Sequence, residues 1–407
     1  MFYNRRVNCL NLRGVDNLQK KYIKKLLIIS LALVLIFGLG TGIMAQQKNE
    51  EDYDSFDKFQ QVLYYLKNYH IEEMSYDKLL EGAINGMLQE ADPFSYYLTP
   101  DEYEEMQIEF EGHFGGIGIR IVTQNGELTI VSPIKGTPGD KVGLQAKDVI
   151  THIEGKPTAE MTQKEAVDMM RGEPGTDVNI TIRREDEDKP LDFKITRADI
   201  EIPYVSSEMK TNQIGYISIA EFAEDVGLKV KNSITNLKAE GAQAIILDLR
   251  SNPGGLLNEA VNVASNFIDK GTIVSARQRS GKPEIYKTLS DIKAVDLPLV
   301  VLTNGGSASA SEIVSAAVRD HERGELVGTR TFGKGTVQRV IPLQDGSAVK
   351  MTIARYYTPD EEFIHEKGIE PDVEVEFDPE SEKDQQIQKA IEILKQKLEE
   401  NNMKKAG

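Results

Sequence analysis

From about residue 200 onward, the sequence alternates apolar runs that suit buried strands with segments that suit helices. The expected strands cover residues 214–219, 244–249, 272–276, 299–302 and 326–328, and the expected helices cover residues 223–239, 256–268 and 309–320. This alternation is typical of α/β proteins, in which helices cover a largely parallel sheet. Ligands bind such sheets at the carboxyl ends of the strands. We therefore expect an α/β core over residues 199–378, with functional residues in the loops that follow strands.

One strand–loop–helix unit of this core suits nucleophilic chemistry. The apolar run 299–302 is followed by a loop of small residues (304–308) and then by the expected helix, so Ser309 lies where strand gives way to helix. N–H groups at a helix N-terminus lack intrahelical partners, and the helix dipole favours negative charge there. A nucleophile whose product is an oxyanion is stabilised at such a position. Taken alone, a serine in a Ser/Ala-rich loop is more often a simple helix cap.

A second segment supplies a candidate base. Lys334 lies between two glycines, and Gln338 follows four residues later in an expected strand over residues 337–343. Because side chains alternate along a strand, residues 334, 336 and 338 are expected to share one face. A lysine in water has a pKa of about 10.4, but burial can lower it into the range that base catalysis requires. The neutral amide of Gln338 can hold the amine without stabilising its charge, so the three residues predict a serine nucleophile with a lysine base.

Four longer motifs extend this pattern. They are TNGGSASASE around Ser309, TFGKGTVQ around Lys334, DLRSNPGG at residues 248–255 and GIEPDVEV at residues 368–375. Together they resemble the carboxy-terminal processing peptidases, also called tail-specific serine proteases, and the resemblance extends from about residue 50 to 400. It implies a crotonase-like α/β peptidase core, an inserted β-rich PDZ domain and an N-terminal helical region. The implied activity is that of a serine endopeptidase without a cofactor, which cleaves exported or membrane-associated proteins near their C-termini.

The resemblance also implies roles for individual residues. Ser309 would be the nucleophile, Lys334 the general base and Gln338 the residue that orients the lysine. The Ala310 N–H and a glycine N–H from the first loop would form the oxyanion hole. The choice between Gly254 and Gly255 stays open.

Residues 112–198 differ from their surroundings, because short β-like segments rich in glycine replace helical periodicity. The region resembles a PDZ domain, a module that binds C-terminal peptides. Glycine-rich backbone at a strand edge can present N–H groups to a terminal carboxylate while the peptide adds a strand. Lys147 departs from the pattern, since a glycine usually occupies this position. The expected peptide-binding residues are Gly115, Gly116, Ile117, Gly118, Ile119, Val167 and Met170.

The first 45 residues differ from the rest in charge. They carry seven Lys or Arg and one Asp, a net charge of +6, so the chain total of −17 leaves −23 for the remainder. The basic segment 1–25 precedes an uncharged apolar run, 26–45, that is long enough to span a bilayer. Its basic flank predicts a cytoplasmic N-terminus and an exported body. Ile43-Met44-Ala45 is a weak cleavage site, so a single-pass anchor is favoured over a cleaved signal peptide, which would give a secreted form.

Partners and redox state follow from the same composition. The acidic body argues against a nucleic-acid partner. The resemblance to a PDZ domain implies peptide or protein substrates with free C-termini. Cys9 is the one cysteine and precedes the apolar run, so the exported body contains no disulfide.

Residues 46–111 and 379–407 flank the two domains. Residues 46–56 suit an acidic linker, and apolar residues at helical spacing up to residue 111, interrupted at Asp92-Pro93, predict amphipathic helices. Tyr64, Tyr65 and Tyr69 are expected in the core or in helix–helix contacts. The resemblance implies that this region is structural and can form a homodimer. Residues 384–398 carry one apolar stripe, which predicts a C-terminal helix packed on the body.

Rival interpretations remain open at this point. A catalytically silent PDZ scaffold would keep the fold and bind peptides without cutting them. A crotonase-type hydrolase of acyl thioesters is disfavoured, because no basic adenine-nucleotide site is visible. Gly328-x4-Gly333-Lys334 opens like a phosphate-binding loop, but Gly335 replaces the Ser or Thr that would bind Mg²⁺. The five histidines have neither metal-ligand spacing nor acid partners suited to a Ser-His-Asp triad.

Overall fold

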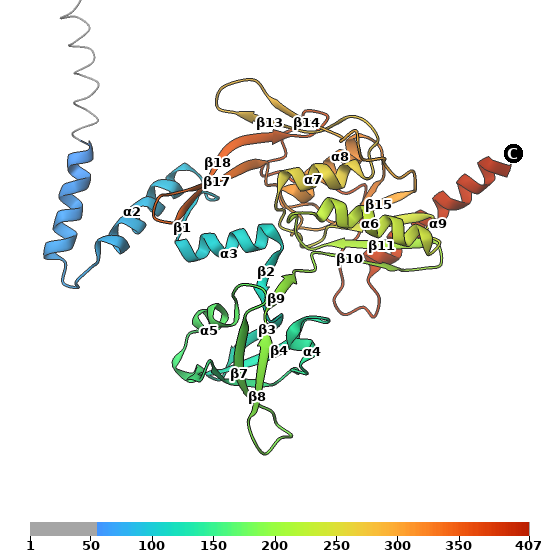
Figure 1. The fold of residues 1–407 in the computed structure, drawn as a ribbon. Coiled ribbons are helices and arrows are strands. Elements are labelled where there is room, and N and C mark those ends of the chain that lie inside the picture. The colour runs from blue at the N-terminus through green and yellow to red at the C-terminus, as the bar shows by residue number, and fades with distance from the viewer. Residues whose placement is uncertain (1–54, 407) are drawn as a thin grey trace, which may run out of the picture. The chain divides into compact units, whose positions relative to one another are not determined.

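A computed structural model describes residues 55–406 (Figure 1). The expected basic segment 1–25, the expected anchor 26–45 and Cys9 lie outside the described residues. Within the described range, no helix is both long and apolar enough to cross a bilayer. By their internal contacts, the described residues divide into two compact units, one on each side of the boundary between Gly86 and Met87.

The core of the second unit is built on a largely parallel sheet. Its strands, in spatial order, are β10 (Val205–Met209), β11 (Ile214–Ile219), β12 (Ala244–Asp248), β15 (Leu299–Thr303), β16 (Glu325–Gly328) and β19 (Val373–Glu374). Only the pair β10–β11 is antiparallel among these neighbours in the described chain. β12 and β15 are buried along their whole length, as strands covered on both faces must be. The expected α/β core is thus confirmed.

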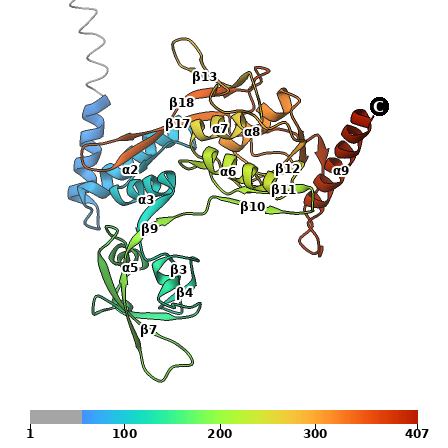
Figure 2. The same cartoon turned by 45° about the vertical axis from the view of Figure 1, so that its right-hand side comes forward.

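Helices cover both faces of this sheet (Figures 1 and 2). One face is covered by α6 (Val226–Ala239), α7 (Leu257–Ser265) and α8 (Ala310–Asp320), and the other by α9 (Gln385–Ala406). Because side chains alternate along a strand, Ile245 and Leu247 pack with the first group, whereas Ile246 packs with α9. The predicted packing of the C-terminal helix on the body is confirmed.

A second, antiparallel sheet lies beside the parallel one. It contains β1 (Tyr96–Leu98), β18 (Ala348–Tyr357), β13 (Thr272–Gln278) and β14 (Glu284–Lys287), with β17 (Thr336–Pro342) also paired to β18. The assignment of residues 272–276 to the parallel sheet is therefore wrong. The chain reverses after β13, so that β14 pairs antiparallel with it, and β18 also pairs antiparallel with β13. β1 was not expected either, because its three residues fall in a stretch predicted to be helical.

The PDZ region forms its own sheet and core. The sheet contains β3 (Ile119–Gln124), β4 (Glu127–Pro133), β5 (Val149–Ile153), β6 (Lys156–Pro157), β7 (Asp177–Arg183) and β8 (Leu191–Thr196). Two helices, α4 (Pro138–Lys141) and α5 (Gln163–Met170), and a 3-10 turn at Thr158–Glu160 complete it. Ile130, Ile150 and Ile180 lie in one buried cluster. Lys147 has φ of 72°, so this lysine adopts the left-handed backbone that a glycine would adopt without strain.

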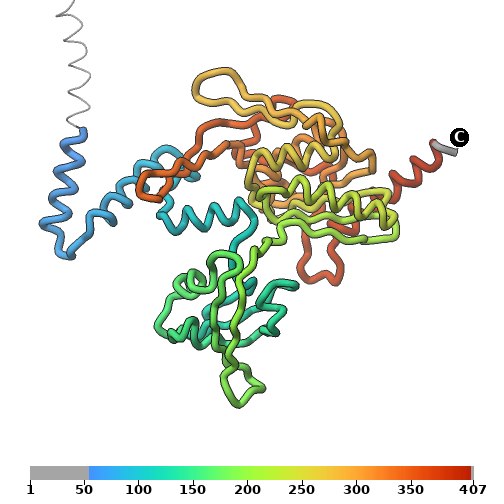
Figure 3. Tube along the Cα trace, viewed as in Figure 1, coloured from blue at the N-terminus to red at the C-terminus, as the bar shows by residue number. Residues whose placement is uncertain are grey.

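A two-stranded ribbon leads into and out of the PDZ region. β2 (His113–Gly116) pairs antiparallel with β9 (Ala198–Glu201), and Figure 3 shows the two segments side by side. The preceding helix, α3 (Pro100–Glu111), begins with a capping box between Thr99 and Glu102. The PDZ region is therefore inserted between α3 and β10 by a paired ribbon.

The N-terminal helices cover residues 55–69 and α2 (Tyr76–Ala91), as predicted. The expectation that Tyr64, Tyr65 and Tyr69 are core residues is wrong, since they are 54%, 57% and 71% exposed. Their rings contact one another, with centroids 5.9 to 6.1 Å apart. The rings meet edge-on or tilted rather than packed face to face, and much of each ring stays in solvent.

Candidate active site

Ser309 lies at the junction of β15 and α8, as the sequence predicts. It is the N-cap of α8 and has φ of 53°, an uncommon value for a residue with a side chain. The preceding loop is held in place by Ser307, whose hydroxyl donates to the Leu249 carbonyl at 2.8 Å and accepts the Asn304 N–H at 3.0 Å. The loop thus presents Ser309 at a fixed position at the end of the sheet.

The loop after β12 lies against Ser309 and requires both of its glycines. A Cβ on Gly254 would lie 2.8 Å from the Ser309 Cβ, and a Cβ on Gly255 would lie 2.4 Å from the Phe222 carbonyl oxygen. The Gly254 N–H donates to Oδ1 of the buried Asn252 at 2.9 Å. Close approach of two backbones therefore explains the paired glycines.

Lys334 and Gln338 meet beside this loop. Lys334 Nζ donates to Gln338 Oε1 at 3.0 Å, and Gln338 Nε2 donates to the Phe94 carbonyl at 2.8 Å. Lys334 precedes β17, and the pairing of β17 with β18 shifts register between Val337 and Gln338. The Lys334 and Gln338 side chains meet although simple strand alternation did not predict this register shift.

The environment of Lys334 favours its neutral form. Burial lowers the pKa of Lys334 below that of an ordinary lysine, and the positive charge of Lys350 lowers it further. Asp92 and Glu312 act in the opposite direction without reversing the shift. A lysine with a lowered pKa is suited to accept a proton.

Glu312 joins the serine loop to the lysine loop, and the sequence reasoning missed it. Its fully buried carboxylate accepts the N–H groups of Ser309 at 2.9 Å, Gly333 at 2.7 Å and Lys334 at 2.8 Å, and the Thr331 hydroxyl at 2.6 Å. The spacing Ser309-x-x-Glu312 is that of a capping box, which could have indicated the first of these bonds. Nothing in the spacing indicated the others.

Tyr356 joins the same two loops from the other side. Its buried hydroxyl lies 3.2 Å from the Ser309 carbonyl oxygen and also contacts the Lys334 carbonyl oxygen. Burial raises the pKa of Tyr356 well above its usual value, so the group stays protonated and can donate.

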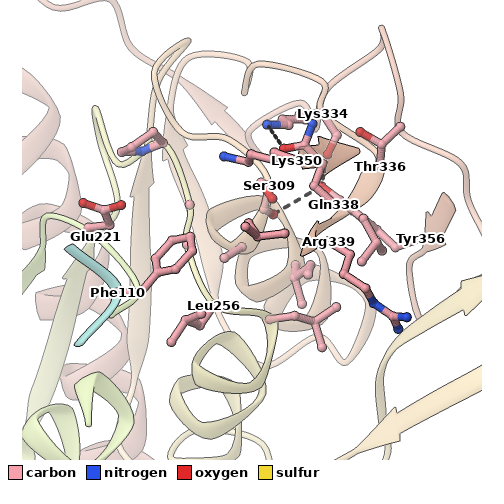
Figure 4. A pocket seen from close by; sticks show the side chains of 18 residues that line it. Phe110, Glu221, Leu256, Ser309, Lys334, Thr336, Gln338, Arg339, Lys350 and Tyr356 are labelled. Carbon is pink, nitrogen blue, oxygen red and sulfur yellow. Dashed lines mark hydrogen bonds between the residues drawn. The ribbon is translucent and has the colours of Figure 1, made fainter. Parts of the chain in front are cut away.

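All six predicted catalytic and oxyanion residues line one cavity of about 460 Å³ (Figure 4). They are Ser309, Lys334, Gln338, Gly254, Gly255 and Ala310. Phe110, Glu221 and Lys350 also line it. Burial, and then the charge of Glu109, raises the pKa of the Glu221 carboxyl. A second cavity of about 550 Å³ shares Leu256, Val337 and Gln338 with the first, so the hollow extends along the sheet.

The predicted peptide-binding residues gather at a different place, in the PDZ region. Six of the seven line an apolar groove of about 130 Å³ between β3 and α5, namely Gly116, Ile117, Gly118, Ile119, Val167 and Met170. Gly115 does not line it, because it faces the loop after α5, where a Cβ would lie 2.1 Å from the Gly172 carbonyl oxygen.

Beyond one end of the groove, the edge of β3 is already occupied. β3 is an edge strand of its sheet, so its outer side is available for pairing. The Thr123 N–H and hydroxyl both donate to Gln163 Oε1 at 3.1 Å, which occupies the edge at that residue. In an antiparallel ladder, alternate residues face outward, so Ile121 is the next residue whose N–H faces the open edge.

Comparison with known proteins bears on this arrangement. Residues 213–375 match peptidase family S41, residues 115–195 match a PDZ domain, and residues 41–102 match the activating protease CtpB N-terminal domain. Carboxy-terminal processing protease CtpA of Bacillus subtilis (strain 168) is 38% identical over 352 residues, covering 86% of this chain and 75% of that protein. The carboxy-terminal-processing protease of Bartonella bacilliformis is 40% identical over 346 residues, covering 82% of this chain and 79% of that protein. The solved photosystem II D1 C-terminal processing protease is 31% identical and covers 78% of this chain and 86% of that one, with a TM-score of 0.47.

The α/β core and the sequence match over it define a serine-type peptidase of family S41 that carries an inserted PDZ domain. Its identity to curated relatives runs over more than four-fifths of its length. The chain belongs to the carboxy-terminal processing protease family.

Proposed function

We propose that this peptidase cleaves exported or membrane-associated proteins near their C-termini, with Ser309 as nucleophile and Lys334 as general base. The observation that carries the proposal is the half-buried Lys334 amine, which is held by a neutral amide in the cavity that Ser309 lines. A desolvated lysine next to a serine at a helix N-terminus is the arrangement that Ser-Lys catalysis requires.

The proposed reaction proceeds in two halves. Neutral Lys334 takes the proton of the Ser309 hydroxyl as Ser309 Oγ attacks the scissile carbonyl carbon, which gives a tetrahedral oxyanion. The lysine ammonium then protonates the leaving amine as the C–N bond breaks, leaving an acyl-enzyme on Ser309. Lys334 then takes a proton from a water molecule as the water oxygen attacks the acyl carbon. The lysine ammonium returns the proton to Ser309 Oγ as the bond from the acyl carbon to Oγ breaks, which releases the carboxylic acid and restores the serine.

The proposed oxyanion hole combines the Ala310 N–H with a glycine N–H from the loop after β12. Ala310 is the first residue of α8, where N–H groups point away from the helix and lack intrahelical partners. Because the Gly254 N–H already donates to Asn252, we favour Gly255 as the second donor. Donors held in place before the reaction stabilise the developing charge without reorganising.

The proposed role of the PDZ domain is to capture the C-terminus of the substrate. The apolar groove between β3 and α5 and the free edge of β3 suit a peptide that adds a strand and inserts an apolar last residue. Capture could tether the substrate or also gate the active site. Deleting residues 113–196 separates these roles, since a tether alone leaves the turnover of saturating short peptides unchanged.

The location proposed for the enzyme is the outer side of the cell membrane. The charge and length of residues 1–45 support a single-pass anchor with the catalytic part outside the cytoplasm. We also propose that the N-terminal helices allow a homodimer, since their exposed face carries Phe56, Tyr64 and Tyr65.

Cut-site mapping tests the proposed function. The full chain is incubated with an unfolded protein, and the products are identified by mass spectrometry. We expect cuts in the C-terminal region, dependent on a free C-terminus and absent with the Ser309→Ala protein. Binding of C-terminal peptides without any cleavage would instead identify a silent PDZ scaffold.

A further inference from the structure

Four residues before β1 reach the lysine from a distant part of the chain. We propose that they form a clasp that keeps the Lys334 amine available as a base. The clasp consists of residues 92–95, Asp92-Pro93-Phe94-Ser95. Its residues touch neither the nucleophile nor the expected substrate position, so they are positioning residues that act through Gln338 and through the Phe94 ring. The inference rests on the proposed role of Lys334 as general base.

The first contact of the clasp fixes which way the Gln338 amide points. The Phe94 carbonyl oxygen accepts from Gln338 Nε2 at 2.8 Å, and a carbonyl oxygen can only accept. The amide nitrogen must therefore face Phe94, which turns Oε1 towards Lys334 Nζ, 3.0 Å away. Without the Phe94 carbonyl in this place, either end of the amide could face the lysine.

The direction of the amide decides whether the amine can act as a base. A neutral amine has two N–H groups and one lone pair, and the lone pair must receive the proton of Ser309. When Oε1 faces Lys334, the amine donates an N–H to it and its lone pair stays free. If the amide were reversed, Nε2 would donate its hydrogen to that lone pair and occupy it. The clasp therefore controls proton transfer without touching the serine.

The Phe94 carbonyl is itself held in place by Asp92 and Ser95. Asp92 accepts the Phe94 N–H at 2.8 Å and the Ser95 hydroxyl at 2.7 Å. The Ser95 hydroxyl in turn accepts the N–H of Thr352, which lies opposite Gln338 in the β17–β18 ladder. Although burial opposes it, hydrogen bonding from Ser95 and Phe94 holds the pKa of Asp92 below its usual value, so these bonds are charge-assisted at neutral pH.

The Phe94 ring contributes to the burial of the amine. Lys334 Nζ lies 4.8 Å from the centre of the ring, which shields one side of it from water. The charged groups that face the amine are Lys350 from β18, Asp92 from the clasp and Glu312 from α8. The clasp thus supplies both the ring that limits solvent access and the carbonyl that orients the amide.

A double-mutant cycle in the full chain tests the clasp. Asp92→Ala frees the Phe94 backbone, and we expect kcat on a saturating peptide to fall by about 10–100-fold. Because the charge of Asp92 raises the pKa of Lys334, its loss should also move the rising limb in the pH profile of kcat to lower pH. In a Gln338→Ala background, Asp92→Ala should cause a much smaller loss, because the amide that the clasp orients is gone and only the shielding by the Phe94 ring can still be lost. Equal losses in both backgrounds, or no loss in the first, would overturn the clasp.

The chain offers a matched control. Asp345, in the turn between β17 and β18, accepts the Ser347 N–H at 3.1 Å and the Ser347 hydroxyl at 2.6 Å, so it makes the same kinds of bond as Asp92. Asp345→Ala should leave kcat and its pH profile unchanged. If Asp92→Ala does not fold, as judged by urea unfolding, Ser95→Ala takes its place in the cycle with the same expected coupling to Gln338.

The same experiment separates the clasp from the catalytic mechanism. Lys334→Ala is included throughout. If it retains full activity, lysine is not the base, and the proposed function fails together with the clasp. If Lys334→Ala is inactive but the losses from Asp92→Ala and Gln338→Ala are additive, the dyad stands and only the clasp is wrong.

Discussion

Ser309 and Lys334 are joined through a single atom. Both of their backbone N–H groups donate to Oε2 of Glu312, at 2.9 and 2.8 Å. The other oxygen of the same carboxylate accepts the Gly333 N–H and the Thr331 hydroxyl. The separation of the two loops is therefore set by a buried side chain that lies behind the site.

Glu312→Gln is expected to damage both stability and activity. The substitution replaces one acceptor oxygen with an NH₂ group that faces backbone donors, so at least one buried N–H loses its partner. Such a loss costs about 1–3 kcal/mol of unfolding free energy, and displacement of the loops should lower kcat by about 10–100-fold. Urea unfolding and peptide turnover measure the two effects.

Asp148→Asn is the control for Glu312→Gln. The buried Asp148 carboxylate accepts the Gln145 N–H and two Arg184 N–H groups, each at 2.7 Å, in the PDZ region, and it lines neither cavity of the core. This substitution should lower stability but leave kcat at saturating substrate unchanged. If Glu312→Gln loses stability yet keeps its kcat, the carboxylate has no role in setting the two loops.

The proposed dyad predicts two severe losses and one milder loss. Ser309→Ala should abolish cleavage, and Lys334→Ala should lower kcat by about 10²–10⁴-fold, the usual contribution of a general base. Gln338→Ala should be milder, because it removes orientation rather than a reacting group. Circular dichroism checks that each protein is folded, and substantial cleavage by Ser309→Ala would contradict the mechanism.

The pH dependence of kcat is expected to report on Lys334. Because the neutral amine is the active form and its pKa is lowered, the rate should rise with pH through an apparent pKa below that of free lysine. Lys350→Gln removes a positive charge that disfavours the ammonium form, so the pKa of Lys334 should rise and the rising limb should move to higher pH. Lys293→Gln, at an exposed position that does not line the cavity, should leave the limb in place. A limb that moves to lower pH in Lys350→Gln would reverse the predicted sign.

The occupied end of the β3 edge predicts how many C-terminal residues of a peptide the PDZ groove binds. Because Gln163 occupies the β3 edge at Thr123, affinity should stop increasing once a C-terminal peptide is about three residues long. In Gln163→Ala, a six-residue peptide can gain one more backbone bond and should bind up to about tenfold tighter than a three-residue peptide.

Fluorescence anisotropy in the Ser309→Ala background measures this affinity without cleavage. Gln124→Ala, an exposed amide on the same strand, is the control. Affinity that keeps rising with peptide length in the unmodified groove would show that Gln163 moves aside.

The sequence allowed prediction of the parallel core, the PDZ region and the cavity residues carried by contiguous motifs. Ser309 could be placed because an apolar run, a loop of small residues and a helical segment follow one another directly. The partners of β13 could not be predicted, since its apolar pattern suits a parallel sheet as well as an antiparallel one. Tyr64, Tyr65 and Tyr69 were wrongly assigned to the core, because helical spacing of apolar residues marks one face of a helix but does not show what covers that face.

The parts of the site that the sequence did not reveal depend on contacts between distant segments. Glu312 is close to Ser309 in sequence, but three of its four bonds go to residues around Lys334. Phe94 lies in the turn before β1, and Tyr356 lies in β18. The positions of both depend on how the strands of the antiparallel sheet pair. Such contacts depend on register, which a single sequence does not specify.

The bond between Phe94 and Gln338 joins residues that are 244 positions apart, with the whole PDZ domain between them. Synthesis proceeds from the N-terminus, and domains generally fold as units in that order. A nascent chain can therefore complete its peptide-binding groove well before Gln338 has been made. On the proposed mechanism, such an unfinished chain can bind tails but leaves them intact until the core is complete.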